Sequence, residues 1–153
     1  TPGSAGRAKA KRRLTRIHAR IYHQRQHGLQ VLSRWCATNL TTLVVEDLNV
    51  AGMTQLRSLA RAVADAGMGD LGRQLDYKAA WYGLNLVTAD RWYPSSRTCS
   101  SCQAINAELT LTDRTWTCSS CHSWHDRDVN AAVNLASWPG QQAQHAPPPL
   151  VAA

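Results

Sequence analysis

Four cysteines have the pairwise spacing of a metal site. Two serines separate Cys99 from Cys102, two more separate Cys118 from Cys121, and fifteen residues lie between the pairs. A C-x-x-C pair on a tight turn offers two thiolates to one metal, and two such turns complete a tetrahedral sulfur shell for Zn²⁺. Four cysteine ligands leave no open coordination position. We therefore expect the zinc to stabilise the fold rather than take part in catalysis.

Other roles for these cysteines fit the sequence less well. Two disulfides are one alternative, but nothing marks the chain as secreted, and two-residue spacing is more typical of metal or redox chemistry. A thioredoxin-like role would need one such motif at the start of a helix in a βαβ unit. His122 and His125 are alternative metal ligands, and the fifth cysteine, Cys36, is expected to be a small buried hydrophobic residue.

Two acidic residues lie where they could hold a divalent cation. Glu46 ends the apolar run 42–46, which is typical of a strand buried on both faces. Asp128 shares one face of an expected helix with Ala132 and Leu135, so we expect its carboxylate to face the sheet, where burial is costly without a partner. Two facing carboxylates either raise each other's pKa or hold a metal ion, and the metal ion suits phosphodiester hydrolysis.

These residues require helices and strands in alternation. A strand, a helical crossover and a second strand form a parallel unit, which places the chain among the α/β folds. Asp126 is expected to cap the last helix at its amino end. The expected helices cover residues 8–39, 55–66, 70–82 and 126–137, and the expected strands cover residues 42–46 and 84–89.

The net charge of +7 is concentrated at one end of the chain. Nine of the seventeen basic residues and none of the ten acidic ones lie in the first 39 residues, so this segment carries +9 and the remainder −2. A merely solvated helix normally mixes both signs, so the pattern favours a polyanion-binding element with nucleic acid as its partner. The basic face consists of Lys9, Arg12, Arg16, Arg20 and Arg34, and the opposite, apolar stripe, which we expect to be buried, consists of Leu14, Ile17, Ile21, Leu29, Leu32, Trp35 and Cys36.

Length and hydropathy exclude several other classes of protein. A chain of 153 residues predicts one domain or one small domain with an insertion. No stretch approaches about 18 consecutive apolar residues, and the amino terminus lacks the pattern of an export signal. We therefore expect a cytoplasmic protein without a membrane partner. The first residue is Thr1 rather than Met, which we interpret as a cut point within a longer protein.

Several motifs, in order, closely resemble the carboxyl-terminal half of TnpB. TnpB is the accessory protein of certain bacterial insertion sequences, often described as a transposase and related to type V CRISPR effectors. The resemblance covers residues 6–138. The motifs that carry it are VEDLNV at 45–50, LDYKAAWYG at 75–83, DRWYPSS at 90–96 and DRDVNAA at 126–132.

The resemblance implies an RNase H-like RuvC nuclease domain with a zinc ribbon inserted before its last helix. Family members are RNA-guided, Mg²⁺-dependent DNA endonucleases that bind DNA and a guide RNA, and RuvC sites use three acids. By motif, the second acid falls on Glu46 and the third on Asp128. The first lies on an opening strand upstream of the arginine-rich helix and does not appear in this chain. Asp47 should point to the other side of its strand and is not expected to replace it.

These expectations define a partial RuvC-like domain without its opening strands, which needs its missing half to cut DNA and is inactive as an isolated chain. The alternative is a non-catalytic, zinc-ribbon remnant of a transposase that only binds nucleic acid, with a steep dependence on salt. The expected parts are a basic helix with the partial RuvC-like region (1–90), the zinc ribbon (91–125), the final RuvC-like helix (126–138) and a disordered tail (139–153).

Aromatic residues gather in and beside the cysteine segment. We expect Trp92, Tyr93, Trp116 and Trp124 to supply the core that a small zinc module needs. Stacking on nucleic-acid bases is the alternative role.

Overall fold

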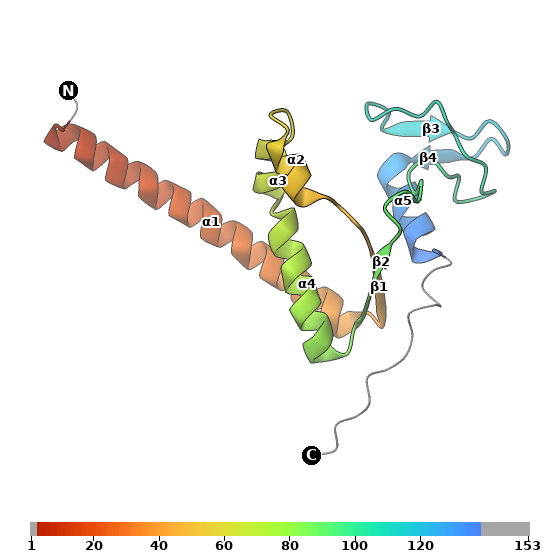
Figure 1. Ribbon diagram of the computed structural model, residues 1–153, viewed down its shortest axis with the longest axis horizontal. Helices are drawn as coiled ribbons and strands as arrows, with labels where there is room; N and C mark the ends of the chain where they lie inside the picture. Colours follow the sequence, from red (N-terminus) through yellow and green to blue (C-terminus); the bar gives the residue numbers. More distant parts are fainter. Residues whose placement is uncertain (1–2, 139–153) are drawn as a thin grey trace, which may run out of the picture. The chain divides into compact units, whose positions relative to one another are not determined.

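The computed structural model describes residues 3–138, which form two compact units (Figure 1). Within the described residues, unit 1 comprises residues 3–41 and 49–84, and unit 2 comprises residues 42–48 and 85–138. The chain contains both helices and strands, as expected of an α/β protein. The expected tail, 139–153, lies outside the described residues. No helix within residues 3–138 combines the length and hydropathy that a membrane span requires.

Unit 1 consists of four helices. They are α1 (Ala5–Asn39), α2 (Val50–Gln55), α3 (Ala60–Ala66) and α4 (Met68–Tyr82). The long first helix is confirmed, and it begins at Ala5 because the Ser4 hydroxyl accepts a hydrogen bond from the amide of Arg7 at 3.2 Å. Helix α2 was not expected. Its signal is Asn49, whose side chain caps the helix by accepting from the amide of Gly52 at 2.9 Å.

Helices α1 and α4 pack through polar side chains. Ser33 and Gln74 are completely buried and share a hydrogen bond of 2.9 Å. The ammonium of Lys78, on a side chain that is also buried, donates to the Gln30 carbonyl at 3.0 Å, to Gln30 Oε1 at 2.7 Å and to Ser33 Oγ at 2.7 Å. Gln26 Oε1 accepts from Gln74 Nε2, so residues spaced by four and three along α1 face the same partner helix.

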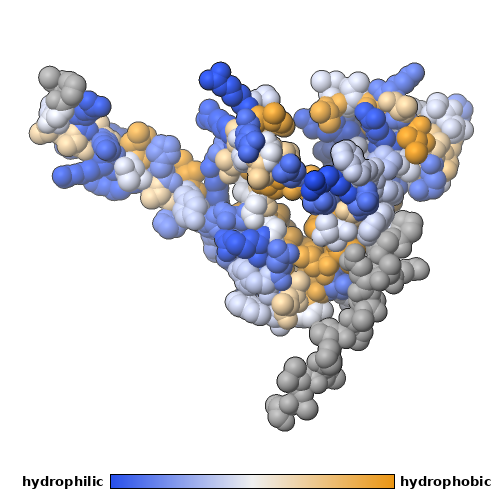
Figure 2. All heavy atoms as spheres, viewed as in Figure 1, coloured by the Kyte–Doolittle hydropathy of each residue, from blue (hydrophilic) through white to orange (hydrophobic). Residues whose placement is uncertain are grey.

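The burial expected for the apolar stripe of α1 is wrong. Five of its members are 38–55% exposed, and Leu29 and Cys36 are half-buried. The face of α1 that α4 covers lies about 120° round the helix from the centre of the stripe. The amino-terminal part of α1 extends past the other helices of unit 1, and Figure 2 shows hydrophobic and hydrophilic side chains exposed along it. The five exposed members are Leu14, Ile17, Ile21, Leu32 and Trp35.

Gly67 separates α3 from α4 and allows α1 to approach them. Its φ of 66° is the left-handed conformation that glycine adopts without strain, and its amide donates to the carbonyls of Val63 and Ala64. A Cβ at this position would lie 2.8 Å from the side chain of Leu29 on α1. The glycine is therefore required both by the turn and by the close helix contact.

Unit 2 contains two small sheets and one helix. Strand β1 (Thr42–Glu46) pairs in parallel with β2 (Asn85–Ala89), which confirms the parallel pair. Strand β3 (Thr115–Thr117) pairs antiparallel with β4 (Trp124–Asp126), and α5 (Arg127–Ala136) follows directly. Asp126 caps α5 as expected, because its Oδ1 accepts from the amides of Asp128 and Val129 at 3.0 Å each.

Two expectations about burial in unit 2 need correction. Residues 42–45 are only half-buried, because β1 has a single neighbouring strand in the described part of the chain. The core of the cysteine segment consists of Cys99, Leu109, Trp116 and Cys118. Trp92 and Trp124, which we expected in that core, are 85% and 67% exposed.

Candidate functional site

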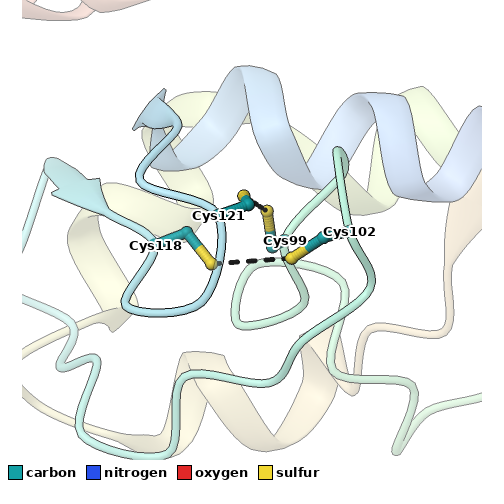
Figure 3. A group of neighbouring side chains, drawn as sticks. All are labelled: Cys99, Cys102, Cys118 and Cys121. Atoms are coloured by element: carbon teal, nitrogen blue, oxygen red, sulfur yellow. Dashed lines mark hydrogen bonds between the residues drawn. The ribbon is translucent and has the colours of Figure 1, made fainter.

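The four cysteines converge on one point in unit 2 (Figure 3). All four sulfur atoms lie within 4.8 Å of one another. The Cys99 and Cys121 sulfurs are 3.6 Å apart, and those of Cys102 and Cys118 are 3.7 Å apart. A tetrahedral zinc site with Zn–S bonds of about 2.3 Å has sulfurs about 3.8 Å apart. The cluster therefore has the dimensions to bind a metal such as zinc.

Both C-x-x-C pairs adopt the same turn. The residue after each second cysteine has a left-handed backbone, with φ of 64° at Gln103 and 60° at His122. The amide of Gln103 donates to the Cys99 carbonyl at 2.8 Å, and the amide of His122 donates to the Cys118 carbonyl at 2.9 Å. Two equivalent turns thus present two thiols each to the same point.

Hydrogen bonds shift the pKa values of the cysteine thiols in different directions. The side chain and backbone of Ser123 lower the pKa of the Cys121 thiol to about 6 by hydrogen bonding to its thiolate. The backbone amides of Cys121 and Ser120 lower the pKa of Cys118. At Cys102 the amide of Ala104 favours the thiolate, yet the neighbouring sulfurs, Cys121 foremost, raise its pKa to about 12. A divalent cation removes this conflict by neutralising the thiolates together.

His125 lies against the cluster without being one of its four members. Its Nε2 is 3.2 Å from the Cys99 sulfur, and its buried ring packs beside Trp116 with centroids 4.9 Å apart. This contact is a hydrogen bond between the imidazole and the Cys99 sulfur, and the group of ligand atoms that could hold a metal consists of the four cysteines without His125. His122, the other alternative ligand, is exposed on its turn.

Glu46 is exposed at the carboxyl end of β1 and has a defined partner. Its Oε1 accepts a hydrogen bond of 2.7 Å from the hydroxyl of Ser95, which is itself buried. The next residue, Asp47, forms an ion pair of 2.7 Å with Arg91. The two adjacent acids are therefore held by different partners, Glu46 by a hydroxyl and Asp47 by a guanidinium.

Asp128 lies in the first turn of α5, and the inward orientation expected for it is wrong. Its side chain is 73% exposed and contacts Arg127 Nε at 3.3 Å and Arg114 Nη1 at 4.0 Å. The buried side of α5 instead carries Asn130 and Asn134, about 120° to 160° round the helix from Asp128. Within residues 3–138, no hydrogen bond or ion pair joins Asp128 to Glu46 directly, although both belong to unit 2.

The basic face of α1 is exposed, and no acidic side chain within residues 3–138 forms an ion pair with it. Among residues 3–138, the ion pairs of α1 involve only Arg25, which contacts Asp65 at 2.8 Å. The side chains expected to bind nucleic acid therefore retain their full charge toward solvent. They are Lys9, Arg12, Arg16, Arg20 and Arg34.

Two family models match the chain over adjacent regions. The model described as "Probable transposase" matches residues 1–57, and the model described as "Cas12f1-like, TNB domain" matches residues 69–135. The second match includes α4 from its second residue onward, all four cysteines and Asp128. Together the two matches support a TnpB-type fragment.

Curated relatives of this TnpB-type chain carry one description. A protein from Streptomyces pristinaespiralis named "Putative RNA-guided DNA endonuclease" is 47% identical over 133 residues, which cover 87% of this chain and 33% of that protein. A protein of Mycobacterium tuberculosis (strain ATCC 25618 / H37Rv) with the same description is 40% identical over 144 residues, covering 90% of this chain and 31% of that protein. The chain thus spans about a third of the length of these relatives.

A solved structure shares the fold of the TnpB-type chain. A chain of the "Cryo-EM structure of the Cas12f1-sgRNA-target DNA complex" matches with a TM-score of 0.61 and 18% sequence identity. The match covers 84% of this chain and 38% of that chain. At this level of identity the likeness concerns the α/β fold alone.

Three residues that organise unit 2 of this TnpB-type chain were not predicted from the sequence. Ser95 contacts Glu46, and Asn130 and Asn134 are buried on α5 with only 2% of each exposed. Two asparagines spaced by four on the inner face of a helix are a usable signal, because buried amides require specific hydrogen-bond partners. The partners themselves lie thirty or more residues away and could not be identified from spacing.

Proposed function

We propose that this chain supplies the carboxyl-terminal part of an RNA-guided, Mg²⁺-dependent DNA endonuclease of the RuvC type, with an inserted zinc ribbon. The observation that carries the proposal is the placement of its two acids. Glu46 ends a strand of a parallel pair, and Asp128 lies in the first turn of the helix that packs against that strand. The descriptions of the curated relatives as RNA-guided DNA endonucleases support the same activity.

Glu46 and Asp128 are the proposed catalytic residues, together with an acid supplied from outside this chain. Carboxylate oxygens are the ligands that Mg²⁺ prefers, so the donor atoms suit this ion. When bound, Mg²⁺ orients the attacking water and stabilises the leaving oxygen of the phosphodiester. The hydroxyl of Ser95 holds the Glu46 carboxylate at 2.7 Å, leaving its other oxygen available to the ion.

The zinc ribbon is proposed to be structural. Four thiolates fill the coordination shell of Zn²⁺, so no position remains for water or substrate. Cys99 and Cys118, two of the four cysteines, lie in the core of the module, and loss of the metal is therefore expected to disorder that core.

The basic face of α1 is proposed to bind the phosphate backbone of DNA or of a guide RNA. Its length of about 50 Å, at about 1.5 Å per residue, allows one helix to follow several phosphates. Charges without acidic partners bind phosphate at no cost of breaking ion pairs. By itself, the chain is proposed to bind nucleic acid without cutting it, because it supplies two of the three acids.

A chimera tests the proposed activity. This chain replaces the matching third of the Streptomyces relative, and cleavage of plasmid DNA in Mg²⁺ is measured with the guide RNA present. Glu46→Gln and Asp128→Asn are each expected to reduce the cleavage rate at least about 100-fold, because each removes one charged ligand of the ion. The matched control is Asp47→Asn, an adjacent acid that pairs with Arg91, and it should retain most of the cleavage.

Two outcomes contradict the proposed activity. Cleavage that survives both Glu46→Gln and Asp128→Asn would exclude these residues from the mechanism. A chimera that remains inactive beside an active parental relative would show that this chain cannot serve as the nuclease part.

A second candidate function is nucleic-acid binding without catalysis. Within residues 3–138, the four cysteines are the group of three or more side chains that could hold a metal ion, and the acidic residues form no such group. This candidate predicts a chimera that binds DNA in a salt-dependent manner and does not cleave it.

A further inference from the structure

Two buried asparagines connect α5 to the segment that leads into the metal cluster. Asn134 Nδ2 donates to the Ser95 carbonyl at 2.8 Å and to the Thr98 carbonyl at 2.6 Å. Asn130 Nδ2 donates to the same Thr98 carbonyl at 2.7 Å. Both asparagine side chains are only 2% exposed, so water cannot replace these hydrogen bonds.

The same helix also contacts the first cysteine turn. Asn130 Oδ1 accepts from the amide of Ser100 at 2.9 Å, and Ser100 lies between the ligands Cys99 and Cys102. On the strand before α5, His125 Nε2 contacts the Cys99 sulfur at 3.2 Å. Helix α5 thus contacts the backbone of the first cysteine turn, and β4 contacts the sulfur of Cys99 in that turn.

The other end of this segment leads to the proposed catalytic acid. Ser95, whose carbonyl accepts from Asn134, donates its hydroxyl to Glu46 at 2.7 Å. Residues 95–100 therefore run from the partner of Glu46 to the first cysteine turn. Asn130 and Asn134 bind this segment from the helix that carries Asp128.

We propose that Asn130 and Asn134 act as positioning residues that couple metal occupancy of the cysteine cluster to the docking of α5. The buried amides keep their partners only while residues 95–100 hold their present backbone conformation. Metal binding at Cys99 and Cys102 closes the turn at the end of that segment. A bound metal thereby fixes the helix that presents Asp128, and by linkage the docked helix strengthens metal binding.

The relevance of this coupling to catalysis rests on the proposed function of Glu46 and Asp128. The coupling itself is tested without cleavage, so its failure and the failure of the nuclease proposal give different results. Loss of cleavage with intact coupling would contradict only the nuclease proposal. Absence of coupling in a protein that cleaves would contradict only the present inference.

Hydrogen–deuterium exchange on the full chain provides the first test. Exchange of the amides of α5 is compared in the Zn²⁺-loaded protein and after removal of Zn²⁺ with a chelator. We expect chelation to increase exchange at least about tenfold in residues 127–136, while α4 in unit 1 serves as the internal reference and remains unchanged. Exchange in α5 that is unaffected by chelation, while the cysteine turns open, overturns the inference without any substitution.

Zinc affinity, measured by competition with a chromophoric chelator, provides the second test. Asn130→Ala and Asn134→Ala are each expected to weaken Zn²⁺ binding by about 10-fold or more, as is typical when an outer hydrogen bond of a metal site is removed. The matched controls are Val129→Ala and Val133→Ala, which change exposed residues of the same helix and should keep the affinity within about twofold. Equal affinities in the asparagine and valine variants overturn the inference.

Discussion

At the scale of single residues, the two cysteine turns are built from residues that are not ideal for them. Glycine adopts a left-handed backbone freely, whereas Gln103 and His122 adopt it at a cost. The amides of Gln103 and His122 nevertheless donate to the Cys99 and Cys118 carbonyls. These hydrogen bonds close the turns, although the left-handed backbone that they require is unfavourable for residues with a side chain. The strain is local and can be removed without altering a ligand.

Replacing either left-handed residue with glycine is expected to strengthen zinc binding. Gln103→Gly and His122→Gly should each relieve about 1 kcal/mol of backbone strain, which corresponds to about a fivefold gain in affinity. Competition with a chromophoric chelator measures the change. Ser119→Gly is the control, because Ser119 lies in the same kind of turn without a positive φ and should gain nothing. A loss of affinity in both glycine variants would show that the side chains contribute more than the strain.

Asp70 provides a residue-scale prediction about pH. Hydrogen bonds from Arg73 and Gln26 lower the pKa of its carboxyl below the ordinary value of an aspartate. Because the folded pKa is depressed, the stabilisation is present above the unfolded pKa and is lost as the pH falls through the folded pKa. Arg73→Gln should raise the pKa of Asp70 toward its ordinary value, and Gln26→Ala should raise it by less.

Carboxyl-carbon NMR titration of Asp70 measures both changes. Arg61→Gln serves as the control, since Arg61 contacts Asp65 and not Asp70. A titration of Asp70 that is the same in all variants would show that these hydrogen bonds do not persist in solution.

The role of a residue could be predicted from the sequence when its partners lie close to it along the chain. The four cysteines were identified because two-residue spacing already determines the turn, and the cluster confirms it. Asp126 was identified as a cap because its partners are the amides two and three residues further along the chain. Ser95 was missed because its contact with Glu46 joins residues 49 positions apart. The joint role of Glu46 and Asp128 stays a prediction.

At the scale of elements, periodicity located the helices better than it identified their packed faces. The α1 helix and the parallel pair were predicted from local patterns, and both are confirmed. The buried face of α1 was not predicted, because a polar face that includes Ser33 meets α4 while five of the seven residues of the apolar stripe remain exposed. Hydrophobic periodicity assumes that apolar residues face the partner, and at this interface hydrogen bonds determine the register instead.

Lys78 is expected to be the main contributor to the pairing of α1 with α4. Lys78→Ala removes the ammonium that donates to two acceptors of Gln30 and to the Ser33 hydroxyl, and it should destabilise unit 1 by about 2 to 3 kcal/mol. Lys78→Met retains the volume of the stem but not the ammonium and should recover only the packing part of the loss. Urea denaturation followed by helical circular dichroism measures both.

The exposed variant Arg61→Ala provides the control for Lys78. Its side chain is 94% exposed, and the change should alter stability by less than about 0.5 kcal/mol. If Lys78→Met proves as stable as the unaltered protein, then packing of the lysine stem, and not its hydrogen bonds, holds the two helices together.

At the scale of the whole molecule, charge is divided unevenly along the chain. The first 39 residues carry +9 and the remainder −2. A polyanion could therefore bind through the net charge of the whole chain or through the basic face of α1, and the two mechanisms predict different effects of salt and of substitutions. Net charge acts over the whole surface and is screened within about 10 Å at 0.1 M salt. Phosphate contacts on one helix instead release counterions at particular positions.

Two charge-matched double variants separate these mechanisms. Arg12→Gln with Arg16→Gln removes two charges from the basic face of α1, and Arg57→Gln with Arg61→Gln removes two exposed charges outside α1. If both arginines of the first variant contact phosphates, the slope of log K against log salt should fall by about 1.8, at about 0.9 per phosphate for duplex DNA. The second variant, with the same net charge, should keep the original slope. Fluorescence anisotropy of labelled duplex DNA across a salt series measures both slopes, and equal decreases in the two variants would assign binding to net charge rather than to α1.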